Sequence, residues 1–383
     1  MITLQEAENA LKNIYLGTMS NLLNTTSNPL MAKIEQTQAD VYGNNIRTAV
    51  RYGINGGVGV GDEDGDLPVA SGNKYLQFTA TLKNLYGQIS ISDKAIRAGR
   101  EGMGAFTDLL NAEITGLLEA SKFNLARMLY GDGSGFLTSV TSISDGVITV
   151  QDTNCLMEGM LVDFYTTSAG IDKAAAKILT VDRINKKITL SVTPSVTSGF
   201  LYVQGSKNKE LSGIKYLFAT SGNLYGVPRS SIASILPYTK SSTGALDDVK
   251  IQEMIDRVEN FSNSKIDFIA MSQTAKYSYL DYLSACKRNV DYMTTDTGFK
   301  AISFGGVPMV YERFVDEGVA YFIDTNALKL HQLCDWRFLE TENGNILRQA
   351  QGKPVYNATL VKYCDLICSK PNGVARFIGV TRA

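Results

Sequence analysis

The chain has too few histidines and cysteines for several common kinds of functional site. Its 383 residues include one histidine, His331, so a histidine-dependent catalytic triad or a multi-histidine metal site has almost nothing to draw on. The five cysteines are an odd and scattered set, which fits a reducing compartment better than a disulfide framework. Cys364 and Cys368 lie four residues apart in a strand-like stretch, so their side chains should point to the same face of the strand. We expect both side chains to pack in the core, with metal binding or redox chemistry as the lesser alternative.

The chain also lacks an excess of charge and a long apolar run. Lys and Arg number 37 against 38 Asp and Glu, which argues against a protein that wraps nucleic acid tightly. No apolar run approaches the roughly 20 residues that span a bilayer, and the first residues do not form a secretory signal. With 44% hydrophobic residues, the chain can still bury large cores, and its length suggests two or three domains. We expect a soluble protein made in the cytoplasm.

The glycine-rich stretch at 56–61 does not complete a phosphate-binding motif. No Lys-Ser or Lys-Thr follows it, and the residues that do follow are acidic, where a phosphate needs donors and a helix amino terminus. Asp64 occupies the third glycine position of the dinucleotide fingerprint. The sequence therefore predicts no bound cofactor.

The acidic residues after the glycines resemble the opening of a calcium loop only in part. Asp62, Asp64 and Asp66 have the required spacing, but Leu67 replaces the needed glycine. Asn73 stands where the bidentate glutamate belongs. A metal site is therefore the lesser interpretation of these carboxylates.

Residues 53–93 form a segment that is too rich in glycine and acidic residues to form a buried core of its own. Its glycines leave the backbone free, and a run of acidic side chains keeps the stretch in water. Residues 77–82 and 87–91 alternate with period two, which predicts two strands that pair into an extended arm with a mobile tip. Because an isolated hairpin is marginally stable in water, we expect a neighbouring molecule to cover this arm.

A long amphipathic helix is predicted to begin at 105 or 106 and to end at Tyr130. Thr107 and Asp108 favour its start, and the glycines at 131–135 end it. At 1.5 Å per residue the helix spans roughly 35 Å, enough to bridge a flat subunit. One apolar face is expected to contain Phe106, Leu110, Ile114, Leu117, Leu125 and Met128.

The sequence changes character after this helix. Residues 137–206 consist of short β-rich runs between turns, which predicts a small all-β insert, either a barrel or a sandwich, with the turn 183–187 closing one hairpin. From 211 onward strands and helices alternate, as in a mixed α/β layer. We expect helices over 246–261, with Val249, Ile251, Ile255, Val258 and Phe261 on its apolar face, and from 272 to 283, and strands at 266–271, 307–311, 319–323, 328–333 and 356–360.

The first 50 residues predict two helical stretches. Apolar residues fall at helical spacing between 4 and 15, and Asn28-Pro29 interrupts before a second stretch from Leu30 to about Val41.

The order of these segments resembles the major capsid proteins of tailed bacteriophages, which have the Hong Kong 97-like fold. The resemblance lies in GGVGVGDEDGDLP at 56–68, KYLQFTATLKNLYGQISIS at 74–92 and the helix with its flanks at 104–135. It continues through 211–214, 225–230 and 362–368.

The resemblance implies an α+β fold with five parts. These are an amino-terminal arm at 1–52, an extended loop (E-loop) at 53–93, peripheral-domain sequence with the long spine helix at 94–136, the inserted β domain at 137–206, and the axial domain with the rest of the peripheral domain at 207–383.

The resemblance also implies a function. It is that of a non-enzymatic capsid protein that assembles as hexamers and pentamers into an icosahedral head and encloses double-stranded DNA without reading its sequence. The implied partners are a portal, a decoration protein and, since no charged coiled-coil leader is present, a separate scaffolding protein, unless a leader was removed before residue 1. The implied locations are the virion and, during assembly, the host cytoplasm. Some members of the family crosslink lysine to asparagine between subunits, but no motif here identifies a reacting pair.

We hypothesise an electrostatic contact between subunits, in which the acidic tip of one copy meets a basic cluster of its neighbour. Solvated charge without a specific partner is the alternative, because exposed ion pairs are usually weak. The seven residues concerned are Asp62, Glu63, Asp64, Asp66, Lys94, Arg97 and Arg100.

Two other classes of function remain open on sequence grounds. An enzyme that uses carboxylate or lysine chemistry leaves no clear linear trace. A surface protein that binds a carbohydrate or a receptor could use the β insert, with Tyr165 and Tyr202 as candidate contacts. Aromatic residues in strands are more often part of sheet packing.

Overall fold

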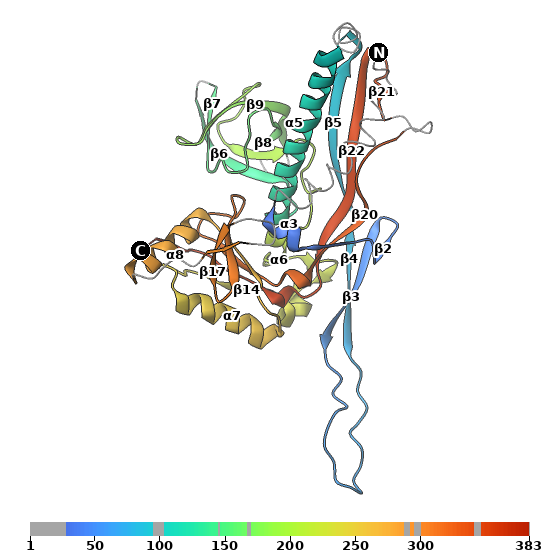
Figure 1. Ribbon diagram of the computed structural model, residues 1–383, viewed down its shortest axis with the longest axis vertical. Coiled ribbons are helices and arrows are strands. Elements are labelled where there is room, and N and C mark those ends of the chain that lie inside the picture. Colours follow the sequence, from blue (N-terminus) through green and yellow to red (C-terminus); the bar gives the residue numbers. More distant parts are fainter. Residues whose placement is uncertain are drawn as a thin grey trace.

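The computed structural model describes residues 28–94, 103–144, 146–166, 170–286, 292–294, 300–340 and 346–382. The chain forms a long sheet flanked by one long helix, a small barrel, a second sheet with two helices, and an arm that projects away from the rest (Figure 1). The mixture of helices and strands confirms the α+β class.

The long sheet is organised around β22 (Val355–Cys368). This strand pairs antiparallel with β5 (Lys83–Ser92), β20 (Leu328–Phe338) and β21 (Arg348–Gln349). β1 (Glu35–Thr37) adds to β20 in parallel. The predicted strand at 356–360 is therefore part of a much longer element of 14 residues.

The predicted long helix is confirmed as α5 (Met103–Tyr130), which begins two residues before the predicted start. It lies beside β5 (Figure 1). Ile114, Leu118, Leu125 and Leu129 are buried among the apolar side chains of the long sheet. This apolar stripe fixes the helix against the sheet, because the removal of these side chains from water is the main source of stabilisation.

The arm consists of β3 (Asn45–Gly53), β4 (Lys74–Thr81) and the loop at 54–73 between them, which we call the arm loop. Phe78 is buried at the base of the arm. The predicted pairing of 77–82 with 87–91 is wrong. β4 pairs with β3, whereas β5 pairs with β22, because the chain continues from β4 into β5 without reversing at Leu82.

The predicted helix from Leu30 to Val41 is also wrong beyond its first turn. The chain forms α3 (Pro29–Lys33), capped by the Asn28 side chain, and then β1. β2 (Val41–Tyr42) pairs with β3. Burial of Leu30 and Met31 needs only one helical turn, after which pairing with β20 takes over. The predicted helix at 4–15 lies outside the described residues.

The inserted β domain is a closed barrel with a core of its own. The turn at 183–187 joins two adjacent strands, as predicted. Val162, Phe164, Ile178 and Leu201 are among the buried residues that fill it. Its strands, in the order in which they pair, are β10 (Lys187–Leu190), β7 (Val147–Val150), β6 (Phe136–Ser144), β11 (Gly199–Val203), β8 (Leu161–Tyr165) and β9 (Ile171–Asp182).

The second sheet has seven strands and is covered by α7 (Asp248–Ser262) and α8 (Gln273–Ala285). The helix prediction at 246–261 is correct in position but not in its face, because Val249 and Phe261 are each 73% exposed. The strands, in pairing order, are β14 (Tyr238–Lys240), β23 (Val374–Phe377), β19 (Ala320–Ile323), β15 (Phe268–Met271), β18 (Val307–Tyr311), β17 (Lys300–Phe304) and β16 (Tyr292–Thr294).

Short elements connect these parts. They are α6 (Ile214–Leu217), the pair β12 (Asn223–Leu224) and β13 (Val227–Pro228), and the 3-10 turns η2 (Arg229–Ile235), η3 (Thr325–Ala327) and η4 (Pro371–Gly373).

Candidate assembly surfaces

The arm loop holds the predicted acidic residues in water. Asp62, Glu63, Asp64 and Asp66 are all exposed, on a loop that extends away from the sheets and the barrel (Figure 1). The polar contacts of this loop are local ones, such as the bond from the Gly57 amide to the Asn55 side chain (2.8 Å). The position of the loop suits a contact with another molecule.

The arm loop also exposes an unusual number of aliphatic side chains. Removing one such side chain from water stabilises a protein by about 1.5–3 kcal/mol, so their joint exposure favours association with a covering surface. These aliphatic side chains were not among the contact residues predicted from the sequence. The alternation of valine with glycine at 57–61 was the available signal. The exposed fractions are Ile54 81%, Val58 89%, Val60 103%, Leu67 89% and Val69 86%.

The basic residues of the hypothesised contact are only partly described. Lys94 is exposed, just beyond the end of β5, whereas Arg97 and Arg100 lie outside the described residues. β5 runs away from the arm, so Lys94 and the acidic tip lie at opposite ends of the molecule (Figure 1). One copy of the chain therefore does not bring the two charged groups together.

A groove with a volume of about 730 Å³ opens between three elements. Its walls are residues 81–87 of β4 and β5, one face of α5 between 117 and 128, and the segment 203–210 that leaves the barrel. The walls include Trp336, which is 4% exposed, and Asn124. This volume lies within the usual range of ligand sites. The groove was not predicted from the sequence, because its walls come from distant parts of the chain.

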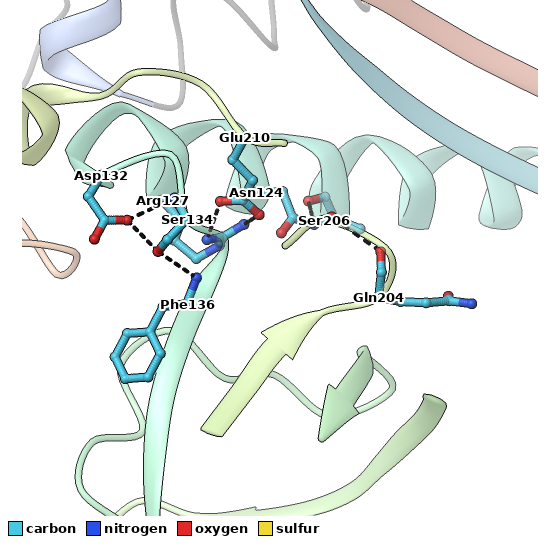
Figure 2. Close-up of polar contacts among 9 residues, drawn as sticks. Asn124, Arg127, Asp132, Ser134, Phe136, Gln204, Ser206 and Glu210 are labelled. Atoms are coloured by element: carbon cyan, nitrogen blue, oxygen red, sulfur yellow. Dashed lines mark hydrogen bonds and ion pairs between the residues drawn. The ribbon is translucent and has the colours of Figure 1, made fainter. Parts of the chain in front are cut away.

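A buried ion pair fixes one wall of the groove to the barrel connection. The Arg127 guanidinium donates to both Glu210 carboxylate oxygens, at 2.8 and 2.5 Å, and both side chains are 4% exposed (Figure 2). Nearby, Asp132 accepts hydrogen bonds from the amide and the hydroxyl of Ser134, which shapes the turn from α5 into β6. The pair is bidentate, so it holds α5 and residue 210 in one orientation.

The barrel carries a cluster of aromatic side chains that includes both tyrosines of the alternative function. Tyr165 and Tyr202 pack edge to face, with ring centroids 5.1 Å apart, and Tyr202 also packs against Phe136. The Lys207 Nζ lies 3.8 Å from the centre of the Tyr165 ring. The lysine lies over the Tyr165 ring and Tyr202 is 9% exposed, so both rings are engaged in packing within the barrel.

Two buried carboxyl groups have raised pKa values. Burial raises the pKa of Glu312 to about 7. Burial also raises the pKa of Asp365 to about 6, although hydrogen bonds from Ser212 and from the Leu366 amide favour its charged form. These groups lie at junctions in the core and do not line the groove.

The histidine and the two buried cysteines have structural positions. His331 is 2% exposed, and its Nδ1 lies 2.9 Å from the carbonyl oxygen of Ala39, so it ties the chain after β1 to β20. Cys364 and Cys368 are fully buried, and burial raises the pKa of each thiol to about 12. Such thiols are unreactive.

The described ranges contain no candidate metal site and no candidate membrane span. No group of three or more His, Cys, Asp or Glu side chains there is arranged to hold a metal ion. No helix in the same ranges is both long and apolar enough to cross a membrane.

Comparison with known proteins identifies the fold. No protein-family model matches the sequence, and no curated protein matches it. The structure is similar to a chain of the Cyanophage A-1(L) capsid asymmetric unit, with 11% identity, a TM-score of 0.55, and coverage of 94% of this chain and 92% of that chain. At this identity the likeness shows the fold, which is the Hong Kong 97-like capsid fold expected from the sequence.

Two further similarities are weaker. The capsid of a native GTA particle has 12% identity and a TM-score of 0.48, with 93% of this chain and 90% of that chain covered. The holo-SrpI encapsulin complex from Synechococcus elongatus has 10% identity and a TM-score of 0.47, with 91% and 85% covered. Scores at this level support no inference about function.

Proposed function

We propose that the chain is a major capsid protein, which assembles into the icosahedral head of a tailed bacteriophage around double-stranded DNA. The observation that carries the proposal is the arm loop, on a chain that shares its fold with a cyanophage capsid protein. The loop exposes five aliphatic and four acidic side chains far from the body of its own chain. Contacts between many copies would cover it.

The proposal includes the partners and the location that the sequence resemblance implied. Copies of the chain form hexamers and pentamers, with a separate scaffolding protein, a portal and a decoration protein as partners, in the virion and, during assembly, in the host cytoplasm. The balance of 37 basic and 38 acidic residues supports enclosure of DNA without tight or sequence-specific binding. The role is structural and not enzymatic. The five-part division at residues 53, 94, 137 and 207 belongs to the same proposal.

The acidic tip is part of the assembly contact in this proposal. The sequence hypothesis places it against Lys94, Arg97 and Arg100 of a neighbouring copy, and the exposure of Lys94 is compatible with that. Replacing Asp62, Asp64 and Asp66 by lysine is expected to weaken assembly and to change its dependence on salt. Unchanged assembly and unchanged salt dependence would show that the charges are only solvated.

Electron microscopy of the purified full-length chain tests the main proposal. We expect closed shells, or rings of five and six subunits. A variant in which residues 54–73 are replaced by an Asn-Gly turn should retain the circular dichroism spectrum of the parent, because the loop adds little to the core, but should fail to assemble. A compact monomer at every concentration, or equal assembly without the loop, would refute the proposal.

The structure does not favour the carbohydrate-binding alternative. The cation and the neighbouring ring that pack on Tyr165 leave little of its surface for a ligand.

A further inference from the structure

We infer that the turn at 312–319, between β18 and β19, is a latch that holds the second sheet against α5 and the barrel, and that ionisation of Glu312 opens it. This segment is called the latch turn below. All the groups concerned lie within one copy of the chain, so the inference goes beyond the proposed function and does not depend on it.

The latch turn contacts both α5 and the barrel. The Phe314 ring packs edge to face on Phe123 of α5, with ring centroids 5.1 Å apart. The Arg313 guanidinium lies 5.3 Å from the centre of the Phe123 ring. The same guanidinium donates at 3.5 Å to the carbonyl oxygen of Leu156, which belongs to the barrel core. A short connection of the second sheet therefore touches two other parts of the fold.

Polar contacts join the latch turn to α6 and to the second sheet. The Asp316 carboxylate lies 2.6 Å from the Lys215 ammonium of α6. The Glu312 amide donates to the Met271 carbonyl at the end of β15 (3.0 Å), and its own carbonyl accepts from the Val315 amide (3.3 Å). The position of Glu312 is therefore fixed by the sheet, while the residues that follow it reach the other parts.

The titratable groups near the Glu312 carboxyl are phenols, which do not neutralise its charge. Burial and, to a smaller extent, the Glu312 carboxylate raise the pKa of Tyr130, the last residue of α5, well above its ordinary value. Tyr321 of β19 adds to the same shift. Burial also raises the pKa of Tyr311 in β18, again with a smaller contribution from Glu312. The Tyr130 hydroxyl is buried and has no hydrogen-bond partner among the described residues, so the surroundings are poor in polar groups.

The nearest cations of the latch region are directed elsewhere. The Arg313 guanidinium lies over the Phe123 ring, and the Lys215 ammonium pairs with Asp316. Glu312 is 8% exposed, and burial alone raises its pKa to about 7, with no contribution from a cation in the described part of the chain. A buried carboxylate without a counter-charge is unfavourable, so the closed latch turn favours the protonated acid.

Opening of the latch turn returns Glu312 to water, where its pKa is near 4.5. The closed turn is therefore fully favoured below pH 4.5, and it loses this advantage as pH rises to about 7. From these two pKa values, the equilibrium constant for opening should rise about 70-fold between pH 5 and pH 8. An open latch turn releases its contacts with α5, α6 and the barrel, which frees the second sheet to change its orientation relative to α5.

Hydrogen exchange of the full-length native chain, resolved by peptide mass spectrometry, tests the inference. The amides of Glu312 and Val315 are hydrogen-bonded, so their exchange requires opening of the latch turn. After correction for the intrinsic exchange rate at each pH, exchange of residues 312–319 should be about 70-fold faster at pH 8 than at pH 5. Glu312→Gln carries no ionisable group at this position and should show almost none of this increase.

Two controls separate the latch from other effects. Glu317→Gln neutralises an exposed acid of the same turn, which accepts from the Thr274 amide, and should keep the pH dependence of the parent. The amides of β10 in the barrel should exchange more slowly than those of the latch turn at both pH values, because local opening leaves the barrel closed.

Three results would overturn the inference. The first is corrected exchange of the parent latch turn that does not change with pH, which needs no variant to be measured. The second is the same increase in Glu312→Gln as in the parent. The third is exchange of the latch turn and of β10 at one common rate, which would mean that Glu312 is exposed only when the whole chain unfolds.

Discussion

Loss of either partner of the Arg127–Glu210 ion pair should destabilise the chain strongly. Both side chains are 4% exposed, so Glu210→Leu leaves a guanidinium without its counter-charge in a region that excludes water. Removing one partner of such a buried pair costs about 3–5 kcal/mol. The same range applies to Arg127→Met, which leaves the carboxylate.

This energy converts to a measurable change in melting temperature. At about 2.1 cal/mol/K per residue, a chain of 383 residues has an unfolding entropy of about 0.8 kcal/mol/K. Each single variant should therefore melt about 4–6 °C below the parent. Circular dichroism melts of unassembled subunits at two scan rates would measure the shift and reveal whether unfolding is irreversible.

The double variant decides whether the pair acts as a unit. Arg127→Met with Glu210→Leu removes both charges together, so it should recover most of the loss, since apolar replacements of a buried pair are often close to neutral. The exposed pair of Lys329 with Glu35 provides a control, and Glu35→Gln should change the melting temperature by about 1 °C or less. Additive losses in the double variant would refute the reasoning.

Three further predictions follow from buried groups and close contacts. Burial raises the pKa of Glu312 from 4.5 to about 7, so the folded chain keeps a proton that the unfolded chain releases. Stability should fall by about 3 kcal/mol as pH rises through that window, and Glu312→Gln should remove this loss in melts at pH 5 and pH 8. Gly213→Ala should lower the melting temperature because its Cβ would lie 2.3 Å from a carbonyl oxygen of α5, whereas Gly116→Ala meets nothing within 4 Å and should raise it. An aromatic disulfide reagent should label the exposed Cys286 in the native chain and reach Cys364 only on unfolding, with equal labelling rates contradicting the assigned burial.

Local periodicity predicted most elements of the fold correctly. The stripe of apolar residues in α5 and the short alternating strands of the barrel depend on neighbours in sequence, and both predictions are confirmed. The chain-wide resemblance then predicted the Hong Kong 97-like arrangement, which the similarity to the cyanophage capsid confirms.

Strand partners were not predictable from such local patterns. β4 and β5 alternate alike, so sequence alone suggested a hairpin between them, but β5 finds its partner about 270 residues further along the chain, where Leu85 pairs with Lys362. The face of α7 was misjudged for a related reason. Its buried stripe is Ile251, Met254 and Val258, while Phe261 lies over the Arg257 guanidinium in water.

The candidate site was predictable in part. The acidic run and the glycines marked the arm loop as exposed. The groove could not be inferred, because Asn124, Trp336 and Lys209 are brought together by three different connections. The sequence also gives no sign that the buried Trp336 Nε1 lacks a hydrogen-bond acceptor among the described residues, because this depends on which groups pack around the ring.

The chain passes directly from β4 into β5 at Leu82, so a change in the direction of β5 is transmitted to the arm. Leu82 is 5% exposed, and its amide donates to the Asn44 carbonyl at 3.0 Å. The junction between β4 and β5 is therefore held in place, whereas the arm loop extends into water. A tilt of only about 5° in β5 would swing the end of β4, about 26 Å away, by about 2 Å. In an assembly of the proposed kind, a small rotation of β5 in one copy would therefore become a larger displacement where its arm contacts the next copy.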